Sequence, residues 1–447
     1  MYINYDRSYK KRGRRNSSKV WKVFFAMIVI SGFGLGAYFA FGSQLNIVNK
    51  NGHSGQNLSQ NEGTASNNNQ SDTNGKSAKP TITVTPTASP IVSPVTVQNS
   101  TGAGSDADQT QPDTRVPVEV KGLYVTGYTA GTSKINDLIN IADSTEINAL
   151  VIDVKNDDGR ISYAMDSTTA KQIGAVTNGI ADMPALIKQL KEKNIYTIAR
   201  IVSFKDPLLA EKRQDLALKF SDGSLYRDSK GQCWVNPYKK EVWDYLMEVA
   251  TQAAAIGFNE IQFDYIRFST GGDIDKVDFG EEAKTKSKED VITDFTKYAY
   301  NTLKPLGVFV SADVYGAIIN SKIDAGLVGQ NYVEMSKYLD FICPMIYPSH
   351  FGDGNYGVQY PDLEPQKIIT KALEASKKKQ DQIPEGEHRA IVRPWLQDFT
   401  ATWLKNHKTY GGPEVREQIN GVYAAGYKEW LLWNASTNYS KSGLNAE

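Results

Sequence analysis

The sequence contains very little cysteine and histidine. Only Cys233 and Cys343 occur, with four histidines, among 447 residues. Two cysteines cannot build the disulfide framework of a small exported scaffold, and we expect two separate thiols, Cys343 in an apolar strand and Cys233 in a loop. There is no Cys/His group at zinc spacing and no glycine-rich phosphate loop, so neither a metal nor a cofactor is predicted.

The chain also has no excess of positive or negative charge. It has 50 Lys and Arg against 50 Asp and Glu, and no basic stripe follows the first 22 residues. A nucleic-acid-binding domain would need such a stripe. Nucleic acid is therefore not an expected partner.

The N-terminal region is the one place where charge and apolar residues separate. Residues 1–22 are basic, and residues 23–42 are an uncharged run rich in Val, Ile, Phe and Ala, about as long as a bilayer core requires. Positive charge on its N-terminal side predicts a cytoplasmic N-terminus and an exported remainder. The alternative is a cleaved signal peptide, for which Ala37-Tyr38-Phe39-Ala40 is a poor cleavage site. We favour an uncleaved transmembrane anchor.

Residues 43–115 are rich in Asn, Gln, Ser, Thr, Gly and Pro and nearly free of aromatics. Such a segment buries too little apolar surface to offset its ordering entropy. We expect a disordered linker, which either holds a domain away from the membrane, for example across a cell wall, or has no spacing role.

Residues 116–447 read as one large domain in which strands alternate with helices, the pattern of a parallel sheet. The predicted strands are 122–128, 149–155, 195–202, 260–266, 308–314, 341–347, 390–396 and 429–434. The predicted helices are 134–143, 183–192, 239–256, 288–303, 364–377 and 414–425. Eight strands with intervening helices predict a (β/α)8 TIM barrel, and the missing dinucleotide fingerprint argues against a Rossmann fold. Residues 220–238 fit no helix and are predicted as a loop over the barrel mouth.

The fourth strand carries the most informative pattern. Glu260, Gln262 and Asp264 share one face, opposite Ile261 and Phe263. A barrel tolerates polar residues on an inward face that leads to its C-terminal mouth, where active sites lie. Asp264 therefore predicts catalysis, with a buried structural ion pair as the alternative.

Other strand ends carry polar and aromatic residues that would meet at the same mouth. They are Asp153 and Lys155 in the second strand, Arg267 after the fourth, Asp313 in the fifth, Tyr347 and His350 after the sixth, Arg393, Trp395, Gln397 and Asp398 in the seventh, and Trp433 in the eighth. Several of them have a simpler interpretation. Asp313 could cap a helix, the two tryptophans could belong to the core, and His350 could be an exposed loop residue. Together they match a saccharide site, in which carboxylates cleave, aromatic faces stack on sugar rings, and Arg, Gln and His bind hydroxyls.

Four motifs resemble a bacterial family of glycoside-hydrolase-like TIM barrels of uncharacterised activity. They are residues 261–268 (IQFDYIRF), 311–316 (SADVYG), 345–351 (MIYPSHF) and 393–399 (RPWLQDF). The resemblance spans about residues 120–438 and implies a saccharide-acting site at these strand ends. No Glu ends the fourth or seventh strand, so a catalytic pair must use Asp, or Asp with a loop acid such as Glu281 or Glu282.

The sequence thus predicts a membrane-anchored, extracellular barrel that hydrolyses a cell-surface or extracellular polysaccharide. Asp264 is the first candidate carboxylate, held ionised by Arg267; Asp313 is its partner, and Asp398 is the second choice. Asp153 and Lys155 would pair and orient the substrate. The competing readings are a non-catalytic glycan- or cell-wall-binding barrel and a metal-dependent deacetylase, for whose usual ligands the histidines are too few.

Overall fold

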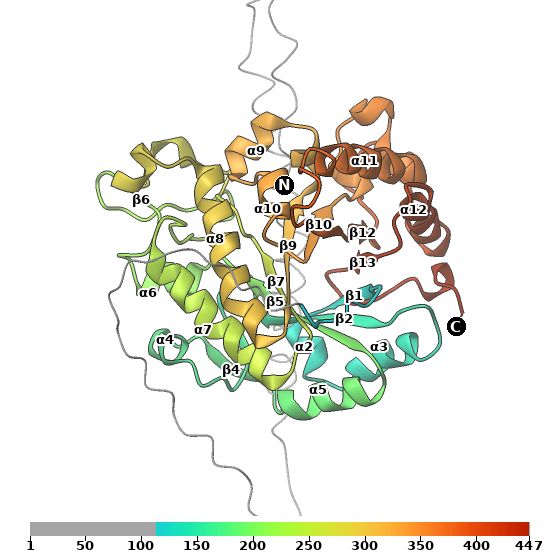
Figure 1. The fold of residues 1–447 in the computed structure, drawn as a ribbon, viewed down its shortest axis with the longest axis horizontal. Helices are drawn as coiled ribbons and strands as arrows, with labels where there is room; N and C mark the ends of the chain where they lie inside the picture. Colours follow the sequence, from blue (N-terminus) through green and yellow to red (C-terminus); the bar gives the residue numbers. More distant parts are fainter. Residues whose placement is uncertain (1–112, 447) are drawn as a thin grey trace, which may run out of the picture. The chain divides into compact units, whose positions relative to one another are not determined.

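Residues 113–446 are described by the structure, a computed structural model (Figure 1). Eight parallel strands form a closed barrel, because the first pairs with both the second and the last. They are β1 (Lys121–Val125), β2 (Ala149–Lys155), β5 (Tyr196–Val202), β7 (Glu260–Asp264), β9 (Phe309–Tyr315), β10 (Phe341–Met345), β12 (Trp395–Gln397) and β13 (Trp430–Trp433). The predicted (β/α)8 barrel is confirmed.

The seventh predicted strand is divided in two. β11 (Ile391–Val392) pairs with the start of β10, and β12 pairs with its end. Arg393 and Pro394 separate them, and proline has no N–H to donate to a ladder.

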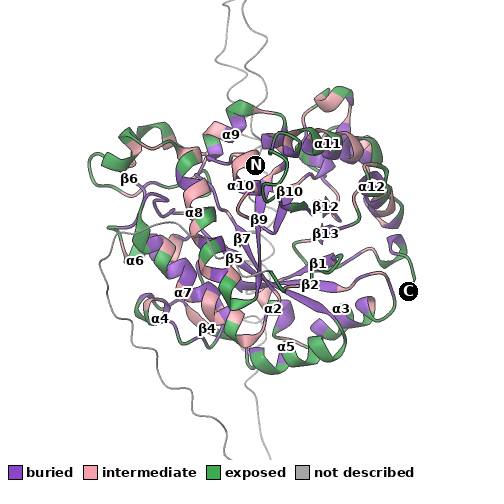
Figure 2. Cartoon of the chain, viewed as in Figure 1, coloured by how far each residue is buried: buried purple, intermediate pink, exposed green. Residues whose placement is uncertain are grey.

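The six predicted helices are present and surround the barrel. They are α3 (Ile135–Ala142), α5 (Met183–Glu192), α7 (Lys240–Ile256), α8 (Lys288–Leu303), α11 (Pro365–Gln380) and α12 (Gly412–Ala424). Local chemistry sets their ends: Ser287 and Asp290 form a capping box at the start of α8, and Gly257 ends α7 in the left-handed conformation at φ 109°. Figure 2 shows their inner faces buried and their outer faces exposed.

The structure adds short elements that the sequence did not predict. They are α2 (Gly127–Ala130), α4 (Thr168–Ile173), α6 (Pro207–Lys212), α9 (Lys322–Val328), α10 (Tyr332–Ser336), and the strands β3 (Ile161–Tyr163), β4 (Val176–Ile180), β6 (Lys219–Phe220) and β8 (Val277–Asp278). Residues 220–238 form no helix, as predicted, and Trp234 from this segment is fully buried.

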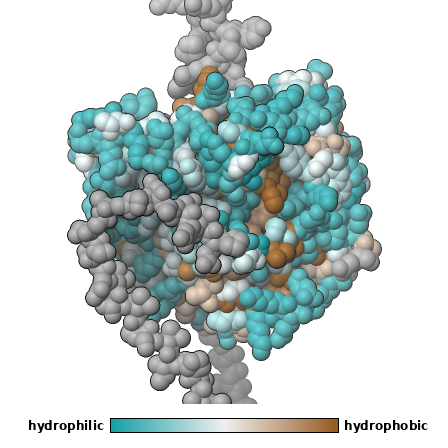
Figure 3. Space-filling view, viewed as in Figure 1, coloured by the Kyte–Doolittle hydropathy of each residue, from teal (hydrophilic) through white to brown (hydrophobic). Residues whose placement is uncertain are grey.

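β7 shows how the barrel separates two packing regions. Phe263 points outward, where its ring meets Phe295 of α8 at 5.5 Å. Gln262 points inward, and its Nε2 lies 3.5 Å from Cys343 Sγ of β10. The alternation read from the sequence is confirmed, and so are the two thiols, which are both free and buried. In Figure 3 hydrophilic residues cover most of the described surface in view, with a hydrophobic strip toward its centre.

The folded domain begins before the predicted boundary at Val116. Arg115 Nη1 donates to Val308 O (2.7 Å) and Asp340 Oδ2 (2.8 Å), and Nη2 donates to Asp340 Oδ1 (2.8 Å). The guanidinium lies 4.5 Å from the centre of the Phe309 ring. Arg115 therefore fixes the start of the domain at the N-terminal end of β9.

The predicted anchor at 23–42, and the predicted linker up to residue 112, lie outside the described residues. Within residues 113–446, no helix is both long enough and apolar enough to cross a bilayer.

Candidate active site

A cavity of about 220 Å³ opens at the C-terminal ends of the barrel strands. We call it the rim cavity. It is lined by seven residues that the sequence predicted: Asp264, Arg267, Asp313, Tyr347, His350, Trp395 and Trp433. Asp157, Arg200, Tyr265 and Tyr315 line it as well. The predicted convergence of acids and aromatics on one rim is thus present.

Arg200, on β5, is the central cation of the cavity. Its Nε and Nη2 donate to Asp264 Oδ2 at 3.0 and 2.5 Å, its Nη1 donates to Asp153 Oδ1 at 2.6 Å, and its Nη2 also donates to Asp157 Oδ1 at 3.1 Å. The side chain is 1% exposed. A buried guanidinium needs such partners, because an unpaired buried charge is very costly. Arg200 therefore holds three carboxylates at fixed positions.

Asp264 has its charge stabilised from two directions. Arg200 binds Oδ2, and the Tyr265 N–H donates to Oδ1 at 2.6 Å. Tyr265 adopts φ 48°, in the left-handed region that a tyrosine rarely occupies. Strain of this kind persists where the surrounding structure enforces it, often at functional sites.

Asp313, on β9, occupies a very different environment. It is 2% exposed, and Trp395 Nε1 donates to its Oδ1 at 2.6 Å. Burial and the negative charge of Asp264 raise the pKa of Asp313 well above its usual range. Asp264 and Asp313 thus lie in opposite environments: Asp264 is bound by a cation, whereas Asp313 is buried beside a negative charge.

Asp157 lies at the edge of this cluster, after β2. Although burial opposes it, the charges of Arg200 and Lys205 lower the pKa of Asp157 to about 2. Lys205 Nζ is 3.1 Å from Asp157 Oδ2 and lies 4.6 Å from the Tyr265 ring centre. Asp157 is therefore ionised at neutral pH.

Aromatic rings form one wall. Trp433 stacks on Tyr124 with ring centres 4.1 Å apart, and Trp395 meets Trp433 edge to face at 5.8 Å. Arg200 lies 5.5 Å from the Tyr124 and Trp433 rings. Flat aromatic surfaces and charged hydrogen-bonding groups therefore share one small space.

Residues 122–439 match the model of a family described as "Putative glycosyl hydrolase domain". The chain belongs to this family. The resemblance read from the four motifs is confirmed.

The chain is also similar to several solved structures. The PgaB (BpsB) glycoside hydrolase domain of Bordetella bronchiseptica is 13% identical to this chain, with a TM-score of 0.53 and 72% of this chain and 95% of that chain covered. A hypothetical protein of Ruminiclostridium thermocellum ATCC 27405 is 39% identical, with 43% and 97% covered and a TM-score of 0.40. The spore cortex-lytic enzyme SleL of Bacillus megaterium QM B1551 is 11% identical, with 73% and 74% covered and a TM-score of 0.43. No curated protein matches the sequence.

Within this glycosyl-hydrolase-like barrel, the sequence prediction missed the cation that binds Asp264. The cation that binds Asp264 is Arg200, whereas Arg267 donates to Phe268 O at 2.9 Å and lies 4.6 to 4.9 Å from the ring centres of Tyr315, Trp234 and Tyr265. Arg267 nevertheless lines the rim cavity.

The predicted pairing of Asp153 with Lys155 was also wrong. The register of β2 against β5 shifts between these two residues, so they do not share a face. Asp153 binds Arg200 and accepts from Tyr124 Oη at 2.6 Å, while burial raises its pKa. Lys155 is completely buried and pairs with Asp206 at 2.8 Å, so it cannot contact a substrate.

Arg393 does not reach the mouth. It is fully buried, binds both Glu260 oxygens at 2.9 Å, and donates to Glu429 at 2.7 Å. Glu260 begins β7 and Glu429 precedes β13, so this cluster lies at the N-terminal end of the barrel. The predicted substrate role of Arg393 is replaced by a structural one.

Gln397 and Asp398 are buried and tie loops together. Gln397 accepts from Ser349 and donates to Phe399 O, and Asp398 accepts from the N–H and Oγ of Ser440 at 2.8 Å each. Burial raises the pKa of Asp398. Both are placed behind the rim by these contacts, which corrects the expectation that they act on substrate.

The residue that the sequence reading missed is Arg200. A strand reading Tyr196-Thr197-Ile198-Ala199-Arg200-Ile201-Val202 is apolar enough to be buried throughout, and every one of its residues is. A lone Arg in such a strand demands buried acids. The sequence therefore did contain a signal for Arg200: a buried arginine needs acidic partners, and three strands with acids at their ends were already predicted.

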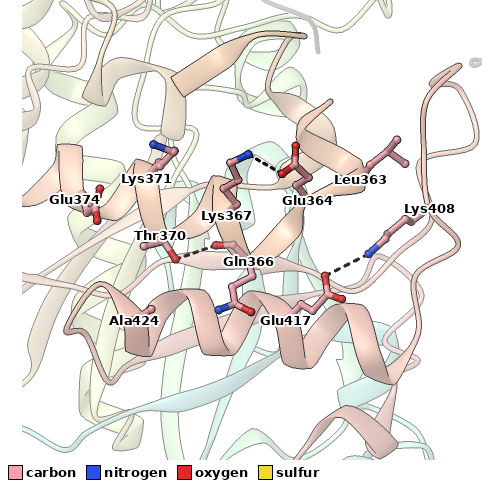
Figure 4. Close-up of a pocket in the computed structure, with 10 residues that line it drawn as sticks. All are labelled: Leu363, Glu364, Gln366, Lys367, Thr370, Lys371, Glu374, Lys408, Glu417 and Ala424. Atoms are coloured by element: carbon pink, nitrogen blue, oxygen red, sulfur yellow. Dashed lines mark hydrogen bonds and ion pairs between the residues drawn. The ribbon is translucent and has the colours of Figure 1, made fainter. Parts of the chain in front are cut away.

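A second hollow lies on the outside of the barrel, between α11 and α12 (Figure 4). It has a volume of about 650 Å³ and is lined largely by charged side chains. Two pairs of them neutralise each other, with Lys367 bound to Glu364 at 2.7 Å and Lys408 to Glu417 at 3.3 Å.

Within residues 113–446, no cluster of three or more His, Cys, Asp or Glu side chains is arranged to hold a metal ion.

Proposed function

We propose that the chain is a membrane-anchored, exported glycoside hydrolase that cleaves a cell-surface or extracellular polysaccharide. The observation that carries this proposal is the pair Asp264 and Asp313. Both line the rim cavity, one bound to a guanidinium and the other with a raised pKa. Glycoside cleavage needs one carboxyl group that is ionised and one that donates a proton, and a nearby cation favours the first whereas a raised pKa favours the second.

In this mechanism Asp313 is the proton donor. Trp395 binds its Oδ1, which leaves Oδ2 to carry the proton. As the bond between the anomeric carbon and the glycosidic oxygen breaks, Asp313 protonates that oxygen. The leaving sugar departs as an alcohol, and Asp313 is left as a carboxylate.

Asp264 stabilises the positive charge that develops on the anomeric carbon. It does so either as a nucleophile or as the base that activates water. If Asp264 is the nucleophile, water then hydrolyses the glycosyl-enzyme bond, supplies the hydroxyl at the anomeric carbon and returns a proton to Asp313. If Asp264 is the base, it takes the proton of the attacking water, and exchange with solvent returns Asp264 to the carboxylate and Asp313 to the acid. In this proposal Trp433, Trp395 and Tyr347 pack against sugar rings, and His350 and Arg267 bind hydroxyls.

The decisive variant is Asp264→Asn, which keeps the shape and removes the charge. Turnover of polysaccharide should fall by several orders of magnitude while binding persists, because the carboxylate acts in the transition state. Reducing ends released from cell-wall and exopolysaccharide fractions measure turnover, and co-sedimentation measures binding.

Asp398→Asn is the matched control, since Asp398 is also a buried acid but binds Ser440 outside the cavity. It should retain turnover. A wild-type chain that binds polysaccharide without cleaving it would favour the alternative, a non-catalytic glycan-binding barrel in which Arg200 and its three acids form only a polar contact surface.

The anchoring part of the proposal rests on the sequence. From the sequence we expect residues 1–22 to be cytoplasmic, residues 23–42 to span the membrane, and a linker that begins at residue 43 to lead to the barrel. N-terminal sequencing of the membrane fraction tests it. A mature start near Gly42 or Ser43 would mean a cleaved, secreted protein.

A further inference from the structure

An aromatic row leads out of the rim cavity along one side. Tyr347 lies in the cavity wall, and its ring centre is 5.1 Å from that of His350 and 5.9 Å from that of Phe399. Beyond them lies Trp403, stacked on Phe399 at 6.1 Å and 23° and in edge contact with His350 at 6.4 Å. The row runs from a buried ring to an exposed one: Tyr347 is 6% exposed and Trp403 is 48% exposed.

Hydrogen bonds fix the two loops that carry the aromatic row. Gln397 Oε1 accepts from Ser349 N and Oγ at 3.1 and 2.6 Å, and Gln397 Nε2 donates to Phe399 O at 2.9 Å. Ser349 Oγ is also 3.0 Å from His350 Nδ1. One buried amide thus joins the loop that carries His350 to the loop that carries Phe399 and Trp403.

The size of the rim cavity requires a surface of this kind. Its volume of about 220 Å³ is below the roughly 300–1,000 Å³ of pockets that enclose a small-molecule ligand. A polysaccharide whose reacting unit lies over Asp264 and Asp313 must continue outside the cavity. Trp403 offers a half-exposed indole face next to His350, where the chain would leave.

We propose that His350, Phe399 and Trp403 form an outer subsite that stacks on a sugar ring of the polysaccharide beyond the unit being cleaved. This inference rests on the proposed function, because it assigns the remainder of the same substrate. Trp403 is the specificity-determining residue, since the outer subsite favours long glycans over short ones. Aromatic faces suit the apolar faces of pyranose rings.

The test separates binding from catalysis. The full-length chain carrying Asp264→Asn, in detergent, is probed with an array of glucose, galactose and N-acetylglucosamine oligomers of two to six units. We expect the longer members of a bound series to bind more tightly than the two-unit member. Adding Trp403→Ala should weaken binding of the six-unit member roughly three- to tenfold and leave the two-unit member unchanged, and Trp403→Phe should restore most of the loss.

The matched control is Leu306→Ala, an apolar residue 52% exposed in the turn Lys304–Leu306 before β9, at the opposite end of the barrel. It should change neither affinity. Equal affinity for all lengths, or an unchanged six-unit affinity in Trp403→Ala, would overturn the outer subsite while leaving the proposed function standing if the wild type cleaves polysaccharide. No binding on the array together with no cleavage would overturn both.

Discussion

At the scale of single residues, the coupling between Asp264 and Asp313 gives a direct electrostatic prediction. Burial and the charge of Asp264 raise the pKa of Asp313. Asp264→Asn removes that charge, so the pKa of Asp313 should fall toward its ordinary value. The titration of the Asp313 carboxyl carbon, followed by 13C NMR in wild type and variant, measures the change. An unchanged pKa would mean that the two carboxyl groups do not interact.

The same shift sets the pH dependence of turnover. A proton donor acts only while it is protonated, so activity should decline as pH rises through the raised pKa of Asp313. Asp157 adds no limb near neutral pH, because its pKa is about 2 and it stays ionised.

The residues show which side-chain roles a sequence can reveal. Asp264 and Asp313 were predictable because each is an acid near the C-terminal end of a strand, on the face that points into the barrel. The partner of Asp264 was not, because Arg267 is near in sequence whereas Arg200 lies on the neighbouring strand β5. Lys155 was misplaced because the alternation of side chains assumed for β2 is interrupted by a register shift.

At the scale of elements, Lys155 joins β2 to the strand and helix beside it. Its Nζ donates to Val202 O of β5 at 2.7 Å and pairs with Asp206, whose Oδ1 caps α6 by accepting from Leu209 N at 2.8 Å. Lys155→Met leaves a buried carboxylate without its cation and should cost roughly 3–5 kcal/mol of unfolding free energy. Urea unfolding measures the loss.

Adding Asp206→Asn to Lys155→Met is the control. Asparagine still caps α6 but carries no charge, so the double variant should regain most of the lost stability. Glycan binding should be normal in both variants. A folded Lys155→Met protein that no longer binds glycan would restore the substrate role predicted from the sequence.

The long helices and strands were predictable because the hydrophobic period repeats over many residues in each of them. Residues 183–192 and 288–303 match α5 and α8, and residues 149–155 match β2. The short pieces β3 and α6 span three and six residues, too few for a period to be read. β3 is set by its pairing with β2, whereas α6 is started locally by the Asp206 cap and by Pro207.

At the scale of the whole molecule, Arg115 defines where the domain starts. Its side chain is 7% exposed and the Asp340 side chain 9%. A chain beginning at Val116 lacks this ion pair and should be less stable than one beginning at Asp113, by roughly 3 kcal/mol. Calorimetric melting of the two proteins measures the difference.

Arg115→Met in the longer chain should reproduce that loss. Arg213→Met, which removes an exposed arginine bound to Asp215, should change stability by less than about 0.5 kcal/mol. Equal melting of the two truncated chains would place the boundary at Val116, as the sequence alone suggested.

Closure of the barrel has a kinetic consequence. β1 is held on one side by β2 and on the other by β13, and Val120 N donates to Glu429 across 309 positions of the chain. The ring therefore cannot close until its last strand has been synthesised, and contacts this far apart in sequence form slowly. Until then β1 and β12 present unpaired edges, which favour association with other chains. In the exported protein that we propose, this interval lasts until the C-terminus has itself crossed the membrane.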